Sequence, residues 1–289
     1  MAGTLFVVAT PIGNLEDLSF RALRTLKEVD LIAAEDTRRT SKLLAHYAIR
    51  KSMVSLREHN ERREAPRLIE RLKSGASIAL VSDAGTPGIS DPGQFLVRSA
   101  REAGITVIPI PGPSAVMAAL SASGETGDAF VFMGFVPRSG ALRTKWLKSL
   151  ESEPRPVVFF EAPHRVERLM ADLASVLVNR PIHVFRELTK INESYVIRPN
   201  ISDDSTIPSI GEFVIVAGKV ADNKDDQDSS QVTIDQAALM FDCLTNNSSF
   251  TNDEANSLVA RALGIDEQAI RKAVKKARIA KRRIEESLS

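Results

Sequence analysis

Cysteine is almost absent from this chain, and long apolar runs are absent too. The one cysteine, Cys243, can form neither a disulfide within the chain nor a cysteine metal cluster, which is typical of a protein from a reducing compartment. No apolar run approaches the roughly 20 residues of a membrane span. Residues 5–9 are apolar, but they are too few for a signal peptide and no basic residue precedes them. These absences predict a cytoplasmic globular protein.

An excess of charge of either sign is also lacking. The chain has 38 Lys and Arg against 37 Asp and Glu, so its net charge is only +1. No global field therefore indicates a nucleic-acid partner, and any basic surface must be local. The four histidines show no spacing typical of metal ligands, so we predict no metal site. What the chain has in quantity is apolar residues, 43% of 289, which is enough for two domains and a small tail.

Short apolar runs alternate with amphipathic segments over the first hundred residues. The runs expected to form strands are 5–9, 30–34, 54–56, 77–81 and 106–108. The segments expected to form helices are 18–28, 37–47, 62–73, 94–103 and, further on, 115–120. Continuous apolar strands separated by helices are typical of a largely parallel sheet that is covered on both faces.

The pattern changes in the middle of the chain. Strand-like runs at 129–135, 157–160, 182–185 and 213–217 have fewer helices between them. We therefore expect two α/β domains, residues 1–117 and 118–221. Residues 222–232 are polar and acidic, as in a linker, and residues 233–289 form a small, basic, all-helical C-terminal domain, with helices expected at 235–244, 253–263 and 266–283.

Four strands of the first domain end in chemically unusual turns. The longest turn, residues 81–93, has Gly or Pro at five of its thirteen positions, which excludes a regular element. The others are residues 10–14, 35–38 and 111–114. Each alone is explained as a connecting turn or a helix cap. In a parallel sheet, however, all four lie at one edge, and open α/β sheets bind their ligands there.

These loops lack the signatures of a nucleotide site. No Gly-x-Gly-x-x-Gly turn follows the first strand, and the chain has no Walker lysine motif. Loops rich in Pro suit a ligand that is held by carbonyl groups, a few amides and apolar walls. S-adenosylmethionine would fit such a site, because it carries an adenine, a ribose, a sulfonium and an amino-acid end but no phosphate.

Residues 9–17, 35–38, 82–93 and 111–115 resemble the tetrapyrrole-methylase fold superfamily. Residues 159–166 (FFEAPHRV) and 186–190 (RELTK) extend the resemblance to the subfamily that methylates the 2′-oxygen of a cytidine in small-subunit (16S) ribosomal RNA. The resemblance covers about residues 4–220. It implies S-adenosylmethionine in a cleft between two domains, 16S ribosomal RNA within the small subunit as partner, and a homodimer. The alternatives are a tetrapyrrole C-methyltransferase and a non-catalytic ribosome-binding factor on the same fold.

The resemblance also implies which residues bind the cofactor and which carry out the reaction. The implied cofactor contacts are Pro11, Asp83, Gly85, Ile89, Ser114, Ala115, Glu161, Leu188 and Thr189. The candidates for removing a proton or stabilising charge near the cleft are Glu35, Asp36, His164, Glu187 and Lys190. Simpler roles stay open for three of these groups: an Asx turn for Asp83, a core position for His164 and a structural ion pair for Glu187 with Lys190.

Basic residues gather in the tail. From Gln268 to Arg283 there are eight Lys or Arg residues and no acid, on a helical pattern with an apolar stripe. A phosphate backbone is the expected partner, although a solvated face without a partner explains the same pattern. The expected RNA contacts are Arg38, Arg138, Lys145, Arg165, Lys272, Lys275, Lys276 and Arg282. Trp146 lies in a second basic patch with Arg143 and Lys148, where we expect it either to stack on a base or to pack in the core.

Overall fold

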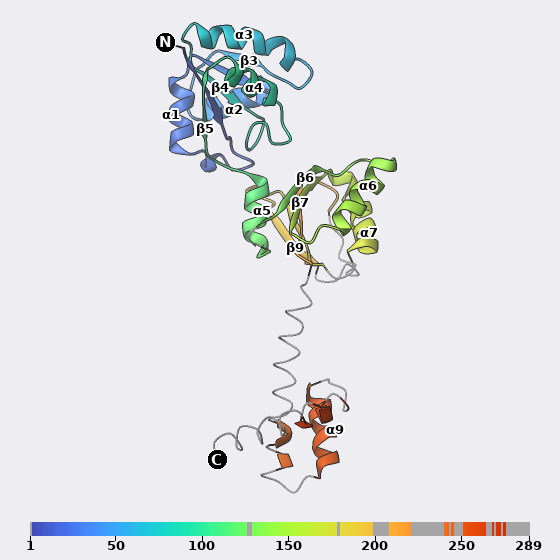
Figure 1. The fold of residues 1–289 in the computed structure, drawn as a ribbon. Coiled ribbons are helices and arrows are strands. Elements are labelled where there is room, and N and C mark those ends of the chain that lie inside the picture. Colours follow the sequence, from blue (N-terminus) through green and yellow to red (C-terminus); the bar gives the residue numbers. More distant parts are fainter. Residues whose placement is uncertain are drawn as a thin grey trace, which may run out of the picture. The chain divides into compact units, whose positions relative to one another are not determined.

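The computed structural model describes residues 2–125, 129–177, 180–198, 208–220, 240–242, 244–245, 251–263, 268, 270–272 and 274–275. The chain divides into two compact units, Met1–Val220 and Ala221–Ser289. The first unit contains two five-stranded sheets (Figure 1). Among the described residues, no helix has both the length and the apolar character needed to span a membrane.

The first sheet is entirely parallel, as predicted. Its strands are β1 (Thr4–Val8), β2 (Leu31–Ala34), β3 (Met53–Ser55), β4 (Ile78–Val81) and β5 (Thr106–Ile110), in the order β3-β2-β4-β1-β5. Each strand coincides with one of the apolar runs predicted from the sequence, and all residues of β2 and β4 are buried. All five carboxyl ends therefore lie at one edge of the sheet.

Helices cover both faces of this sheet (Figure 1). They are α1 (Phe20–Glu28) and α2 (Thr37–His46) on one face, and α3 (Glu61–Lys73) and α4 (Gln94–Glu102) on the other; a 3-10 turn, η1 (Leu15–Asp17), precedes α1. The starts of α1 and α4 follow from their local sequences. Ser19 caps α1 by accepting a hydrogen bond from the amide of Ala22 at 3.1 Å. Gly93 precedes α4 with φ +125°, and a Cβ there would lie 2.7 Å from a methyl of Leu80.

The second sheet is mixed. Its strands are β6 (Val131–Phe135), β7 (Val157–Glu161), β8 (Ile182–Arg186), β9 (Ser194–Arg198) and β10 (Phe213–Ala217), in the order β6-β7-β10-β8-β9. Only the pair of β6 with β7 is parallel. The sequence predicts four of these strands and misses β9. That strand lies at the sheet edge with several residues exposed, so it lacks the continuous apolar run of a buried strand.

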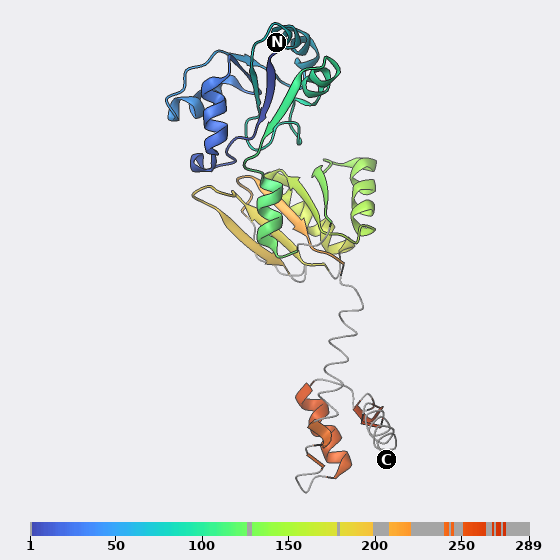
Figure 2. The same ribbon diagram turned by 60° about the vertical axis from the view of Figure 1, so that its left-hand side comes forward.

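Three helices sandwich the second sheet (Figure 2). On one face, α5 (Ala115–Ser123) packs Val116 and Leu120 against strands β7, β8 and β10. On the other lie α6 (Gly140–Glu151) and α7 (Val166–Val176), with η2 (Pro163–Arg165) before α7. The expected domain boundary after residue 117 falls inside α5, and this helix packs with the second sheet.

Two members of the basic patch expected around Trp146 are buried, whereas Arg138, Lys145 and Lys148 are exposed. Trp146 is buried and meets the ring of Phe159 edge-on, with 5.0 Å between centroids. Arg143 is also buried, because its guanidinium pairs with Asp172 at 2.7 Å. Of the two roles expected for Trp146, the structure shows core packing.

The described part of the second unit is helical. Helix α9 (Asn252–Leu263) matches a predicted helix, and its Ala255 and Val259 share a small core with Ile270 and Val274. Lys272 and Lys275 are exposed beside those buried positions, as the apolar stripe predicts. The expected linker 222–232 and the expected RNA contacts Lys276 and Arg282 lie outside the described residues.

Arg180 joins three chain segments at the end of the second sheet. Its buried guanidinium donates to the carbonyl oxygens of Leu150, Glu153, Arg155, Ala217 and Gly218 over 2.7–3.5 Å. Burial lowers the pKa of Arg180 from its ordinary value. Because one side chain satisfies five main-chain acceptors, it substitutes for secondary structure where the ends of α6 and β10 meet.

Replacing Arg180 by Met should destabilise the first unit by about 3 kcal/mol, because buried carbonyl groups would lose their donors. Urea unfolding followed by circular dichroism measures this change. Arg168→Met on the exposed face of α7 is the matched control and should change stability by less than about 0.5 kcal/mol. Equal stability of the two variants would show that the carbonyl groups find other donors.

Candidate functional site

The four unusual loops of the first sheet meet at its carboxyl edge. Thr10 and Gly85 form an isolated antiparallel bridge, with both main-chain hydrogen bonds at 2.9 Å. The loop after β5 joins them, because the hydroxyl of Thr86 donates to the carbonyl of Pro113 at 3.4 Å.

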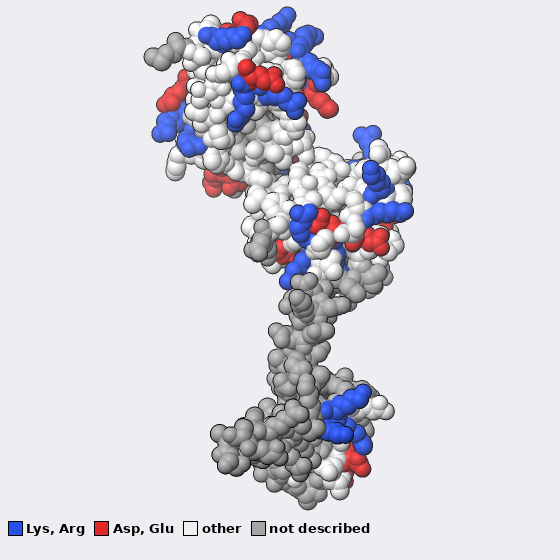
Figure 3. Space-filling view, in the orientation of Figure 1, with Lys and Arg blue, Asp and Glu red and all other residues white. Residues whose placement is uncertain are grey.

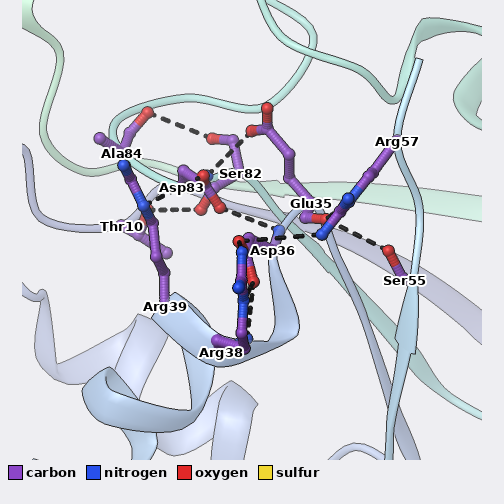
Figure 4. A network of polar contacts seen from close by, with 10 residues as sticks. All are labelled: Thr10, Glu35, Asp36, Arg38, Arg39, Ser55, Arg57, Ser82, Asp83 and Ala84. Carbon is purple, nitrogen blue, oxygen red and sulfur yellow. Dashed lines mark hydrogen bonds and ion pairs between the residues drawn. The ribbon is translucent and has the colours of Figure 1, made fainter. Parts of the chain in front are cut away.

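Carboxylates attach the remaining loop to this group (Figure 4). Asp83 Oδ1 accepts from the amide of Asp36 at 2.9 Å, and Glu35 Oε2 accepts from the amide of Asp83 at 3.1 Å. The loops after β2 and β4 therefore hold each other through side chains that accept main-chain N–H groups. The four loops that were expected to meet at one edge of the sheet are thus joined by direct hydrogen bonds.

A cavity of about 450 Å³ opens between these loops and the second sheet. Its volume lies in the usual range of small-molecule sites. Seven of the residues expected at the site from the sequence line it: Glu35, Asp83, Gly85, Ile89, Ser114, Ala115 and Glu161. The lining residues that sequence reasoning missed include Arg39, Asp91, Phe135, Phe160, Glu212 and Val214.

The other expected cofactor and catalytic residues lie outside the cavity lining. Pro11 precedes the lining residue Ile12. Leu188 packs in the apolar cluster that α5 shares with the sheet. His164 is exposed in η2, which excludes the core position that the sequence left open.

The loop after β8 contacts the loop after β1 of the first sheet, and this contact is called the clasp below. The hydroxyl of Thr189 accepts from the amide of Asn14 at 3.0 Å. A Cβ on Gly13 would lie 2.5 Å from Lys190 Cγ and 2.6 Å from Thr189 Oγ1, so only glycine fits there. Glu187 and Thr189 have φ values of 54° and 67°, which is strained backbone for residues with side chains. The contact therefore fixes one half of the unit against the other.

Lys190 is held inside this clasp by two carboxylates. Its ammonium lies 2.8 Å from Glu187 Oε1 and 3.1 Å from Glu212 Oε2. The hydrogen bond from Lys190 lowers the pKa of Glu187. Because Glu212 also lines the cavity, the ammonium of Lys190 stands one residue away from the cavity wall.

The acids at this edge of the first sheet differ in how readily they ionise. Burial raises the pKa of Glu35, and burial together with the neighbouring charge of Glu35 raises the pKa of Asp91 to about 6. Asp36 behaves in the opposite way, because its hydrogen bonds with Arg38 hold its pKa far below the ordinary value. Glu35 and Asp91 are thus the two acids of this edge whose carboxyl groups hold a proton more readily than usual, which suits an acid–base role.

Glu161, at the end of β7, is fully buried between two guanidiniums. Arg165 contacts one carboxylate oxygen, and Arg143 Nη1 lies 3.8 Å from the other, Oε2. Oε2 accepts no hydrogen bond from the described residues. Arg165 was expected to contact RNA, but its side chain is 17% exposed and lies against Glu161. In this position it orients the carboxylate at the cavity wall.

Asp91→Asn should raise the melting temperature of the protein at pH 7. A carboxyl whose pKa is raised in the folded state stabilises the fold below its unfolded value of 3.8, and this stabilisation is lost as the pH rises to about 6. Asparagine cannot ionise, so the variant does not lose this stability as the pH rises. Its higher melting temperature relative to the parent should therefore disappear as the pH falls towards 4. Thermal unfolding at both pH values measures it. A variant less stable than the parent at pH 7 would show that the ionised carboxylate is itself stabilising.

Comparison with known proteins agrees with this arrangement. The family model of the tetrapyrrole (corrin/porphyrin) methylases matches residues 4–203. The ribosomal RNA small subunit methyltransferase I of Xylella fastidiosa is 49% identical over 238 residues, which are 80% of this chain and 85% of that protein. The protein of the same name from Pseudomonas aeruginosa is 52% identical over 194 residues, 67% of this chain and 69% of that one.

Solved structures share the fold at low identity. Diphthine synthase matches with a TM-score of 0.57 and 19% identity, covering 78% of this chain and 94% of that one. The methyltransferase CobJ has the same score and identity over 76% and 95% of the two chains. The family model and the relatives near 50% identity confirm the resemblance predicted from the motifs, and the chain belongs to the tetrapyrrole (corrin/porphyrin) methylase family.

Proposed function

We propose that the protein transfers a methyl group from S-adenosylmethionine to the 2′-oxygen of a cytidine in small-subunit (16S) ribosomal RNA. The observation that carries this proposal is the identity of 44–52% to proteins named ribosomal RNA small subunit methyltransferase I. A tetrapyrrole C-methyltransferase is less well supported, because two solved uroporphyrin-III C-methyltransferase structures are only 20% and 17% identical and share only the fold. A non-catalytic factor would not need the cavity between the two sheets.

The cavity fits S-adenosylmethionine by its chemistry. The described residues that line it include five carboxylates and one guanidinium, with apolar walls from residues such as Ile12, Ile89 and Phe160. Such a site favours a ligand with positive charge and apolar surface over a phosphate-bearing nucleotide. S-adenosylmethionine carries an ammonium and a sulfonium, and a solved structure of the same fold is titled as a complex with S-adenosylhomocysteine.

We assign the cofactor to the loop residues that line the cavity. Asp83 and Glu161 offer carboxylates, Gly85 and Ile89 form the wall, and Ser114 with Ala115 begins α5. The free N–H groups at that helix start suit the carboxylate of the methionyl end. Pro11, Leu188 and Thr189 are proposed to shape the adjoining loops. When bound, the cofactor supplies an electrophilic methyl group on a good leaving group.

The chain's own residues then have to position the ribose, exclude water and accept a proton. We propose Glu35 as the acceptor, because it lines the cavity and burial raises its pKa. Asp36 and Glu187 are engaged by Arg38 and Lys190, so we propose positioning roles for them. His164 is exposed, at the start of α7, and remains a proposed accessory group.

The RNA is proposed to contact exposed basic side chains. Arg38, Arg138, Lys145, Lys272 and Lys275 are exposed. Arg165 is instead proposed to orient Glu161. We further propose that the enzyme acts in the cytoplasm on RNA within the small subunit, and that it is a homodimer as the family resemblance implies.

Gly85→Leu should abolish binding of S-adenosylmethionine by calorimetry, as well as methylation of 16S ribosomal RNA in small subunits from a strain that lacks the gene. Gly85 has φ +74° and borders the cavity, so a side chain there fills the site. Gly104→Leu is the matched control, since Gly104 has φ +70° and no atom within 4 Å of the added Cβ. Mass mapping of ribose methylation is the readout. If the parent protein methylates no RNA, the proposed function itself is wrong.

Lys190→Met should lower single-turnover methylation about 100-fold while leaving cofactor affinity nearly unchanged, because a cation near the ribose stabilises negative charge on the 2′-oxygen. The variant keeps most of the side-chain stem that packs on Gly13. Lys27→Met on the exposed face of α1 is the control and should keep the parent rate. A Lys190→Met enzyme with the parent rate would assign Lys190 a structural role only.

A further inference from the structure

Three arginines stand over the acidic edge of the cavity. Arg38 and Arg39 come from the first turn of α2, and Arg57 follows β3 (Figure 4). Their side chains are 82%, 66% and 44% exposed, whereas the carboxylates beneath them, Asp36 and Asp83, are only 15% and 23% exposed. A molecule that approaches this edge therefore meets guanidiniums first.

The carboxylates hold each guanidinium by one side. Arg38 donates Nε and Nη2 to Asp36 at 3.1 and 2.7 Å. Arg57 donates Nε to the carbonyl of Glu35 at 3.2 Å, and Arg39 Nε lies 3.5 Å from Asp83. A guanidinium has five N–H donors, and the contacts of these three with other described residues use only part of each fork. The side chains are thus oriented in advance, with donors left for a second anion.

The position of Arg38 and Arg39 is unfavourable for the helix that carries them. The first turn of a helix has a positive dipole end and favours acids, yet the only acid at the start of α2 among the described residues is Asp36 at the N-cap, and the turn itself has none. The ion pairs with Asp36 and Asp83 offset part of this cost, and the guanidiniums themselves stay largely exposed. Basic and acidic side chains are interspersed over the visible face of the first sheet's half (Figure 3), whereas Arg38, Arg39 and Arg57 gather around Asp36 and Asp83 (Figure 4). An anionic ligand would account for this cluster of arginines.

We propose that Arg38, Arg39 and Arg57 form a phosphate-binding site for the RNA strand that carries the methylated ribose. The inference rests on the proposed function and adds a surface to it. Arg39 also lines the cavity, so the site adjoins the place assigned to the cofactor. Phosphodiester groups fit because a guanidinium fork binds two phosphate oxygens at once. The contact is independent of sequence and sets the register of the strand beside the reacting ribose.

The test uses the full-length protein and a fluorescently labelled oligocytidylate RNA. Arg38→Gln with Arg57→Gln removes two charges and leaves the cavity residue Arg39 in place. The slope of log Kd against log salt should then become shallower by about 1.4, as expected for two lost contacts with single-stranded RNA. Arg24→Gln with Lys27→Gln on the exposed face of α1 is the matched control and should keep the parent slope.

Two further measurements separate charge from structure. Arg38→Lys with Arg57→Lys keeps both charges but not the forks, so it should retain the parent slope. Cofactor affinity by calorimetry should be the same for all variants. A parent slope in the glutamine variant would overturn the proposal, and so would an equal loss in the lysine variant, which would reveal a disturbed loop. The proposed function is tested separately, by methylation of 16S ribosomal RNA with the parent protein. If the parent protein methylates this RNA, either result above overturns only the phosphate-binding site. If it does not, the proposed function itself is wrong.

Discussion

The site depends on the mutual hold of acidic side chains and main-chain amides at the edge of the first sheet. Asp83 accepts from Asp36, and Glu35 accepts from Asp83, so the loops after β2 and β4 cannot move separately. Parallel pairing brings these loops to one edge, but pairing alone would leave them loose. The carboxylates complete the arrangement, and the same side chains orient the arginines that stand above them. One set of contacts thus shapes both the cavity and its rim.

Much of the fold could be predicted because the decisive signals are local. Buried strands such as β2 and β4 read as continuous apolar runs, and the loop 81–93 reveals itself by its Gly and Pro content. Strand β9 escaped prediction because an edge strand with exposed residues has neither pattern. Its existence depends on pairing with β8, which is a tertiary property.

The site was predicted in part for the same reason. Residues next to a motif, such as Asp83 and Ser114, could be found from the sequence. Phe135 and Val214 line the cavity only because the second sheet brings its strand ends against the first, and no local pattern shows this. Asp91 lay inside the predicted loop, yet its raised pKa comes from burial and from Glu35, 56 positions earlier in the chain. Trp146 shows that a local pattern can also mislead. Basic residues surround it in the sequence, but in the structure its ring is buried against Phe159.

The order of strands in the second sheet has a consequence for how the protein is made. The last strand, β10, lies at the centre of that sheet and pairs with both β7 and β8. The first sheet has all its strands once residue 110 has left the ribosome, and domains generally fold in the order of synthesis. The second sheet has to wait for residues 213–217, which also bring Phe213 and Val214 to the cavity. A nascent chain therefore carries a folded first half long before it can bind a ligand.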